Sequence, residues 1–425
     1  MASFFIPLTG LEADSTALNT IANDLSNMNT TAFKGQSANF SDLFYQQVGS
    51  AGSGDPVQVG AGTQVASIST DFTQGSINST GSATDVALNG NGFFVVNNGS
   101  GSEYTRGGNF SLDSSGNLIT QNGMSVMGYP AVNGVVNTNS PLTRISIPVG
   151  QVEPPKATST VNMTANLNAT SAAGASFPAQ VTVYDSLGVS HVATVTYTQT
   201  GTNTWSYSAA LPAGDFTSGT STPVTGTMTF DANGNLASVT PAGGAAQTVG
   251  TAAGDISQIP LNFTGLADGA SALNIQWNLL GTSGTPTISQ VAASSAVSAT
   301  TQNGYASGQY QSFTIGADGT VSATFSNGQQ LAVGQVALAN VTNLQGLRML
   351  GDGDYATTMA SGAASIGTSG TAGLGTLQDG ALEESNVNIS AEFSNLIIAQ
   401  RAFEANSKAV TTFDTVTQET INMIH

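Results

Sequence analysis

The side chains of this sequence that could perform catalysis are few and poorly placed for it. His191 and His425 are the only histidines, and there is no cysteine. A general base has to face a nucleophile and an orienting group inside a pocket. His191 follows Asp185-Ser186-Leu187-Gly188, a run typical of a hairpin turn, and no Gly-x-Ser-x-Gly elbow accompanies it. We therefore expect no catalytic residue, and an enzyme is the weakest of the functions considered.

Three further patterns could bind a cation or a phosphate. Asp231-Ala232-Asn233-Gly234-Asn235 resembles the start of a calcium loop, but Ala242 occupies the position that should carry a bidentate glutamate. Asp352-Gly353-Asp354 has no third carboxylate nearby and is typical of a turn. Gly90-Asn91-Gly92 leads into the apolar pair Phe93 and Phe94, so the glycines enter a strand rather than a helix. The sequence predicts no metal and no cofactor.

The charge of the chain also limits its partners. Its 425 residues include 25 acidic and 7 basic side chains, for a net charge of -18, and only 8% of residues are charged. Binding to nucleic acid requires clustered Lys and Arg, so we exclude it. No run approaches the ~20 apolar residues that span a bilayer, and no membrane insertion is expected. All seven Lys and Arg residues lie outside positions 157–347, which marks that stretch as a separate compositional block.

Each end of the chain carries an apolar stripe with helical spacing. The spacing predicts one helix from about Leu8 to Asn27 and another that is capped by Ser385 or Asn386. The two helices either close one monomer as an intramolecular coiled coil or stay partly uncovered until neighbouring subunits bury them. We expect these stripe residues to form an assembly interface: Phe4, Leu11, Leu18, Ile21, Leu25 and Met28 at the start, and Ile389, Leu396, Phe403, Val410, Phe413, Ile421 and Ile424 at the end.

The middle of the chain alternates apolar and polar residues as β-strands do. A strand, a Gly turn and a second strand recur near residues 110–118, 228–236 and 313–321, and each is expected to form a hairpin. The block from 157 to about 300 is expected to consist of half-buried antiparallel strands. Gly- and Ser-rich stretches at 48–64 and 361–380 are expected to be extended, compliant connectors.

These patterns predict a mainly β fold with α-helical termini. The terminal helices pair as a coiled-coil-like domain, followed outward by two β-rich domains, of which the outer is inserted in the inner. The length of the chain agrees with about three domains. The expected boundaries are 1–30 with 386–425 for the helical assembly domain, 31–75 with 361–385 for an extended connector, 76–151 with 301–360 for the inner β domain, and 152–300 for the outer β domain.

The segment that ends the first helix resembles the signature of bacterial flagellar rod, hook and hook-associated proteins. The matching residues are Ala22, Asn23, Leu25, Asn27, Thr31, Phe33 and Lys34. Asp24 departs from the pattern, since many members carry Asn there, and Met28 replaces the usual Ala. The segments 88–94, 104–110, 380–387 and 400–406 are similar to other motifs of the same family. The large interior block and the run Val183-Tyr184-Asp185-Ser186-Leu187-Gly188 resemble the hook members most.

The resemblance implies a structural subunit that forms a helical homopolymer, a flexible hollow tube that transmits torque from rod to filament. It implies contacts with the distal rod protein, the hook cap and the hook-filament junction protein. It also implies location in the flagellar hook on the cell exterior, after export through the flagellar type III apparatus. The absence of a positively charged stretch before the first apolar residues agrees with export without a cleaved signal peptide.

Two alternatives stay open at this point. Another flagellar axial protein, either a distal rod or a hook-associated junction protein, shares the terminal motifs. A secreted β-rich adhesin with a helical stalk suits the Gly, Ser and Thr composition, but it normally requires an anchor or a cleaved signal.

Overall fold

The computed structural model describes residues 5–50, 52, 54 and 56–423. The chain divides into two units. One, the terminal unit, comprises the chain up to Val149 together with Ser312–Thr324 and the residues from Gln330 on. The other, the inserted unit, comprises Gly150–Gln311 and Phe325–Gln329. The fold is therefore mainly β with helical termini, and one β unit interrupts the sequence of the other, as the sequence predicted.

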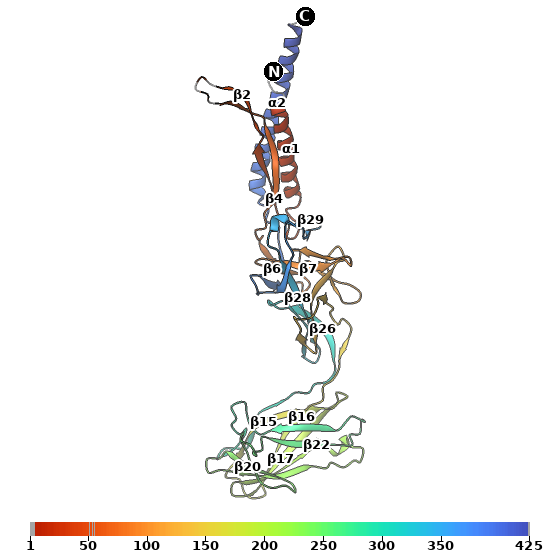
Figure 1. Cartoon of the computed structure of the whole chain (residues 1–425). Coiled ribbons are helices and arrows are strands. Elements are labelled where there is room, and N and C mark those ends of the chain that lie inside the picture. The colour runs from red at the N-terminus through yellow and green to blue at the C-terminus, as the bar shows by residue number, and fades with distance from the viewer. Residues whose placement is uncertain (1–4, 51, 53, 55, 424–425) are drawn as a thin grey trace. The chain divides into compact units, whose positions relative to one another are not determined.

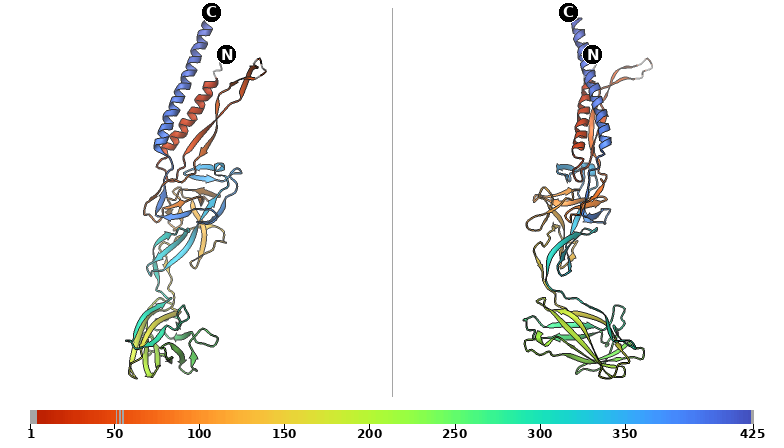
Figure 2. Two further views of the ribbon diagram at one scale, coloured as in Figure 1. Left: turned by 90° about the vertical axis from the view of Figure 1, so that its left-hand side faces the viewer. Right: turned by 180° about the vertical axis from the view of Figure 1, so that it is seen from behind.

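The two terminal helices lie side by side (Figures 1 and 2). Helix α1 spans Phe5–Ser26 and α2 spans Ile389–Asn422. The predicted cap of α2 is wrong, because Asn388 caps it by accepting the N–H of Ala391 at 3.1 Å. Asn386 instead accepts the N–H of Gly35 at 2.8 Å, a partner 351 positions away that local sequence cannot reveal.

The stretches expected as extended connectors are largely paired strands. Strand β2 pairs antiparallel with β3, and β1 pairs antiparallel with β4. In 361–385, β31 pairs with β28, β32 with β6 and β33 with β5. The partners of β31, β32 and β33 are not neighbours in sequence, and the Gly- and Ser-rich composition gave no indication of this pairing. The strands are β1 (Gln36–Asp42), β2 (Tyr45–Ser50), β3 (Pro56–Gly60), β4 (Thr63–Thr70), β5 (Ile77–Ser79), β31 (Ser365–Thr368), β32 (Thr376–Asp379) and β33 (Ala381–Glu383).

The largest sheet runs β14-β26-β27-β28-β11-β7-β8-β30-β29. Most of it belongs to the terminal unit, whereas β14 and the start of β26 belong to the inserted unit. Strand β7 does not alternate between buried and exposed residues, because it is buried on both faces. Its Phe93 and Val95 pack in one core with Tyr104 and Tyr355. The rings of Phe93 and Tyr355 lie 5.4 Å apart. The remaining elements are β6 (Val86–Asn89), β7 (Phe93–Asn97), β8 (Ser102–Thr105), β9 (Ser111–Leu112), β10 (Leu118–Ile119), β11 (Ser125–Val132), β12 (Val135–Val136), β13 (Thr143–Arg144), β14 (Val152–Glu153), β26 (Gly308–Ile315), β27 (Thr320–Phe325), β28 (Gln330–Asn340), η2 (Leu344–Gly346), β29 (Arg348–Gly351) and β30 (Asp354–Ala356).

The three predicted hairpins are confirmed. Strand β9 pairs with β10, β19 with β20, and β26 with β27. Gly116 and Gly234 occupy their turns at φ of 80° and 83°, a region that residues with a Cβ rarely adopt.

The inserted unit packs two sheets around one aromatic core. One sheet, β16-β17-β18-β19-β20-β21, is antiparallel as predicted. The other is mixed, because β15 pairs parallel with β23 and β24, which corrects the all-antiparallel expectation. Trp205 and Trp277 are buried, and Trp205 donates to Gln290. The elements are β15 (Thr160–Asn168), β16 (Ser176–Tyr184), β17 (Ser190–Gly201), β18 (Thr204–Ala210), η1 (Ala213–Asp215), β19 (Val224–Phe230), β20 (Leu236–Pro241), β21 (Gln247–Thr248), β22 (Gln258–Phe263), β23 (Leu273–Asn278), β24 (Ile288–Val291) and β25 (Ala296–Gln302).

Candidate assembly surface

A buried ion pair joins the segment after α1 to the segment before α2. Lys34 Nζ donates to Glu383 Oε1 at 2.6 Å, and both side chains are fully buried. Lys34 also donates to the Thr73 carbonyl at 2.7 Å, while Glu383 Oε1 accepts the N–H of Gly75 at 2.9 Å. Because buried charges are tolerated only when they are paired and hydrogen-bonded, this contact fixes the two terminal segments to each other.

Arg106 adds a second cation to the same buried carboxylate. Its Nε lies 3.6 Å from Glu383 Oε2, and its Nη1 donates to the Gly90 carbonyl at 2.7 Å. Burial lowers the pKa of Lys34 against the opposing effect of Glu383, and it also lowers the pKa of Arg106. One carboxylate therefore serves two buried cations, which makes Glu383 the central residue of the cluster.

Asp24 is a second buried acid at the end of α1. Its Oδ2 accepts the N–H of Gln36 at 2.8 Å, whereas its Oδ1 is buried without a hydrogen-bond partner. Burial is the largest cause that raises the pKa of Asp24 to about 6, and the charge of Glu392 adds to it. The departure from the family pattern at this position thus places an ionisable group where a neutral one would cost less.

The fully buried residues of helices α1 and α2 are small, polar or proline, and none of them belongs to the predicted stripes. The buried positions of α1 include Gly10 and Ala13 but none of its leucines. A Cβ on Gly10 would lie 2.7 Å from the Asn406 side chain, which donates to Asp14 at 2.8 Å. The close approach therefore depends on the missing side chain at Gly10.

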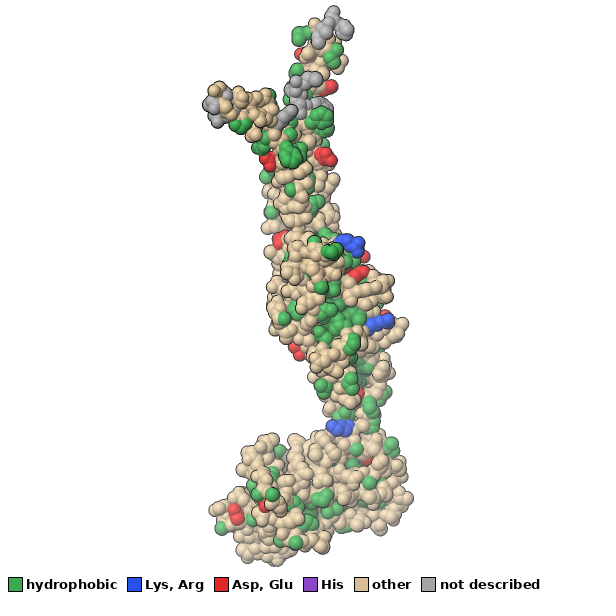
Figure 3. Space-filling view, in the orientation of Figure 1, with side chains coloured by type: hydrophobic (Ala, Val, Ile, Leu, Met, Phe, Trp, Pro, Cys, Tyr) green, Lys and Arg blue, Asp and Glu red, His purple; other side chains and the backbone are tan. Residues whose placement is uncertain are grey.

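The predicted interface residues stay partly or fully exposed in the single chain. Leu11, Leu18, Ile21, Leu25 and Met28 are half-buried, as are Leu396, Val410 and Phe413, while Ile389, Phe403 and Ile421 are exposed. Phe4 and Ile424 lie outside the described residues. Isoleucines that the prediction left out are also exposed, Ile397 at 58% and Ile398 at 67%. Exposed hydrophobic side chains are visible along the helices in Figure 3.

Two further features belong to this surface. A groove lined by Ile21, Ala38, Phe40, Ile398 and Ala399 runs where α1, α2 and β1 meet. The β2–β3 hairpin exposes large apolar side chains as well: Phe44, which precedes it, Tyr45, Val48, Val57 and Val59. We call the exposed apolar residues of α2, together with this groove and hairpin, the assembly surface.

The residues of the family signature lie at the end of α1 and in the segment that follows it. Asn27 donates to the Asn23 carbonyl at 2.9 Å, and half-buried Phe33 donates its N–H to the Thr30 carbonyl at 3.2 Å. Ala22 is exposed, and Leu25 and Thr31 are half-buried. Sequence reasoning did not assign roles to Glu383, Arg106 or Asn406. The signal for them was that each lies in a segment similar to a family motif, at 380–387, 104–110 and 400–406.

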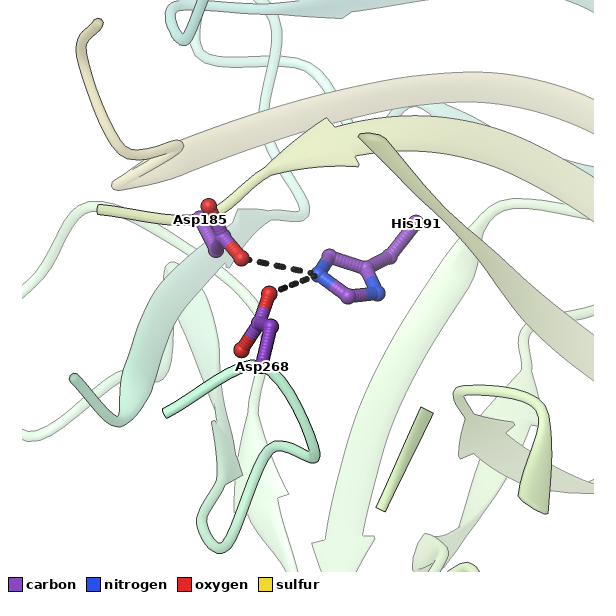
Figure 4. Close-up of side chains that lie close together, drawn as sticks. All are labelled: Asp185, His191 and Asp268. Carbon is purple, nitrogen blue, oxygen red and sulfur yellow. Dashed lines mark hydrogen bonds and ion pairs between the residues drawn. The ribbon is translucent and has the colours of Figure 1, made fainter. Parts of the chain in front are cut away.

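One group of side chains in the inserted unit has the composition of a chemical site. Asp185, His191 and Asp268 place possible ligand atoms within 4.8 Å of one another (Figure 4). His191 Nε2 already bonds Asp185 Oδ2 at 3.1 Å, and Nδ1 bonds Asp215 Oδ2 at 2.9 Å. With both ring nitrogens engaged by carboxylates, the group is an ion-pair network rather than a poised catalytic base. Among the residues described here, no helix is long and apolar enough to cross a membrane.

Comparisons with known proteins agree along the whole chain. The family model of the flagellar basal body protein FlaE D2 domain matches residues 154–305, that of the flagellar hook protein FlgE/F/G D1 domain matches 87–166, and that of the flagellar basal body rod FlgEFG protein C-terminal region matches 378–423. These matches place the chain in the class of bacterial flagellar rod and hook proteins.

Full-length relatives narrow the class further. The chain is 35% identical to the flagellar hook protein FlgE of Escherichia coli K12, over 99% of this chain and 100% of that protein. It is 34% identical to the flagellar hook protein FlgE of Borreliella burgdorferi, over 100% of this chain and 99% of that protein. The chain belongs to the FlgE family of flagellar hook proteins. The crystal structure of Helicobacter pylori hook protein FlgE2 shares the fold, with a TM-score of 0.53 and 15% identity over 72% of this chain and 99% of that one.

Proposed function

We propose that this chain is the structural subunit of a flagellar hook and polymerises through its terminal helices into a flexible hollow tube that transmits torque from rod to filament. The observation that carries the proposal is the exposed apolar face of α2. Ile397, Ile398 and Val416 remain 58%, 67% and 54% exposed although α1 packs against the same helix. An apolar face of this kind calls for another protein surface to cover it.

The size of the effect is sufficient for assembly. Burying one large apolar side chain contributes roughly 1.5–3 kcal/mol. A neighbour that covers several exposed residues of α2 gains enough to offset the cost of association, which is about 4–15 kcal/mol. The hairpin of β2 and β3 offers a second apolar surface to another copy. Polymerisation would bury the apolar side chains that a single chain leaves exposed.

The residues we assign to the interface are the two predicted stripes, with Ile397 and Ile398 added. We retain the proposed domain boundaries 1–30 with 386–425, 31–75 with 361–385, 76–151 with 301–360, and 152–300. Since the stretches 48–64 and 361–380 contain paired strands, they are less suited to act as compliant joints than expected.

The partners proposed for such a subunit are further copies of the chain, the distal rod protein, the hook cap and the hook-filament junction protein. Export through the flagellar type III apparatus without signal cleavage completes the proposal. The principal alternative is another axial protein, a distal rod or junction protein. The adhesin is disfavoured by full-length similarity to hook proteins.

Immunogold electron microscopy tests the location. An antibody raised against residues 157–298 is applied to intact flagella of the source cell. Label confined to the short curved segment next to the cell supports a hook subunit. Label at the rod, at the filament junction or over the general cell surface would favour the corresponding alternative.

A further inference from the structure

His191 is the single basic side chain between positions 157 and 347 of the sequence, and it is buried. Three carboxyl groups surround it, each from a different loop. Asp185 lies in the turn between β16 and β17, Asp215 ends η1, and Asp268 lies between β22 and β23. The distances are 3.1 Å from Nε2 to Asp185, 2.9 Å from Nδ1 to Asp215, and 3.9 Å from Nε2 to Asp268. One imidazole thus joins loops of both sheets.

The arrangement requires a positively charged ring. A neutral imidazole has one N–H and one lone pair, so one ring nitrogen would face a carboxylate lone pair without a proton between them. Both contacts are favourable only when both nitrogens carry protons. Burial opposes protonation, but the hydrogen bonds to Asp215 and Asp185 outweigh it and raise the pKa of His191. Asp185 is held as an anion, because its hydrogen bonds outweigh burial and lower its pKa.

The turn that carries Asp185 also supports the ends of the inserted unit's chain. Gly188 approaches Pro155 and Ser307 so closely that an added Cβ would lie 2.8 Å from Pro155 and 3.3 Å from Ser307. Next to it, Tyr184 accepts the N–H of Thr158 and donates its own N–H to the Thr158 hydroxyl, both at 2.8 Å. We call residues 154–158 and 304–307 the connector ends of the inserted unit.

We propose that protonated His191 is a brace that holds the Asp185–Val189 turn against the connector ends, and that loss of its proton releases them. The connector ends are paired to each other through Lys156 and Tyr305, which exchange two backbone hydrogen bonds. That pair rests on the turn, and the turn is held by Asp185, whose Oδ1 also accepts the N–H groups of Leu187 and Val189. Lys156 itself is exposed, so the charged groups that face His191 are the three aspartates.

The sign of the effect follows from the proton balance. A histidine whose pKa is higher in the folded than in the unfolded state stabilises the fold fully below its ordinary value of 6.5, and the contribution is lost as the pH rises through the higher value. The connector ends should therefore be firm below pH 6.5 and should open more often as the pH rises through the raised pKa of His191.

Limited trypsin digestion of the full chain tests the brace. Lys156 and Arg144 are both exposed, and no other Lys or Arg occurs between Arg144 and Arg348. Cleavage after Lys156 reports opening of the connector ends, and cleavage after Arg144, in the terminal unit, corrects for the pH dependence of trypsin. We expect the ratio of the two rates to rise about fivefold or more between about pH 6 and pH 9, with a midpoint that matches the His191 titration followed by ring NMR.

Variants make the test specific. Asp268→Asn removes one negative charge beside Nε2 and should shift both midpoints to lower pH, whereas Asp231→Asn, a half-buried carboxyl of the same unit outside the group, should shift neither. His191→Gln should give a high ratio at every pH, and fluorescence of Trp205 and Trp277 shows whether that variant still folds. A wild-type ratio that stays flat while His191 titrates, or equal midpoints in the wild type and Asp268→Asn, would overturn the proposal.

Discussion

Lys34 and Glu383 are 349 positions apart in sequence, yet Lys34 Nζ lies 2.6 Å from Glu383 Oε1 in a fully buried contact. Lys34 lies between α1 and β1, and Glu383 ends β33, shortly before α2. Ala32 donates its N–H to the Glu383 carbonyl at 2.8 Å, so the backbone is paired there as well. The two chain ends are therefore joined before either helix meets another subunit.

Loss of the Glu383 charge should destabilise the terminal unit strongly. Glu383→Gln leaves Lys34 and Arg106 buried without a carboxylate, and breaking such a pair costs about 3–5 kcal/mol. Urea denaturation followed by circular dichroism measures the change. Glu384→Gln is the matched control, because that side chain is exposed, and its effect should stay below about 1 kcal/mol. Equal effects of the two substitutions would contradict the central role of Glu383.

Asp24 should make the stability of the terminal unit depend on pH. Its pKa is raised from 3.8 to about 6, so the unfolded chain loses this proton first and the folded state becomes less stable as the pH rises between these values. Asp24→Asn removes that loss and should stabilise the chain at neutral pH by on the order of 2 kcal/mol.

The measurement for Asp24 compares urea denaturation of wild type and Asp24→Asn at about pH 4 and about pH 7. The difference between the two proteins should be small at the lower pH and should grow toward the higher one. A difference that does not change with pH would show that folding does not raise the pKa of Asp24.

Gly10 should control how closely the helices approach. Gly10→Val places side-chain atoms where Asn406 lies, which disrupts its bond to Asp14 and separates α1 from α2 at a cost of about 1–3 kcal/mol. Amide hydrogen exchange in α1 should accelerate by roughly tenfold or more. Ser15→Val, on the exposed side of the same helix, controls for the β-branched side chain. Equal acceleration in both variants would argue against a close contact at Gly10.

Ile398 should matter for assembly and not for the fold. It is 67% exposed, so Ile398→Asp should change the free energy of unfolding of the monomer by less than about 0.5 kcal/mol. In the polymer the new charge would be buried without a partner, and the concentration needed for assembly should rise by about a hundredfold. Sedimentation of polymer measures this, with Ile398→Val as the control that keeps an apolar side chain. Normal assembly of the Asp variant would remove Ile398 from the interface.

Sequence periodicity predicted the structural features that depend on residues close together in the sequence. The alternation that buries Trp205 and Tyr207, and the turn glycines at 116 and 234, were visible because strand and turn patterns are local. The pairing of the two terminal helices was also predicted. The contact between Gly10 and Asn406 was not, because neither residue adds to an apolar stripe.

Pairing between strands and segments that are distant in sequence could not be predicted either. The parallel pairing of β15 with β23 connects Thr160 to Gln276, and the bond between Asn386 and Gly35 crosses nearly the whole chain. No local pattern encodes such partners. The His191 group was equally invisible, since Asp215 and Asp268 come from distant loops.

The most direct test of polymerisation through the helices compares the full chain with chains that lack residues 1–30 or 386–425. Each protein is concentrated under assembly conditions and examined by electron microscopy, with the fluorescence of Trp205 and Trp277 confirming that the inserted unit is folded. We expect tubes from the full chain and none from either truncated chain. Tubes formed by a truncated chain would contradict it.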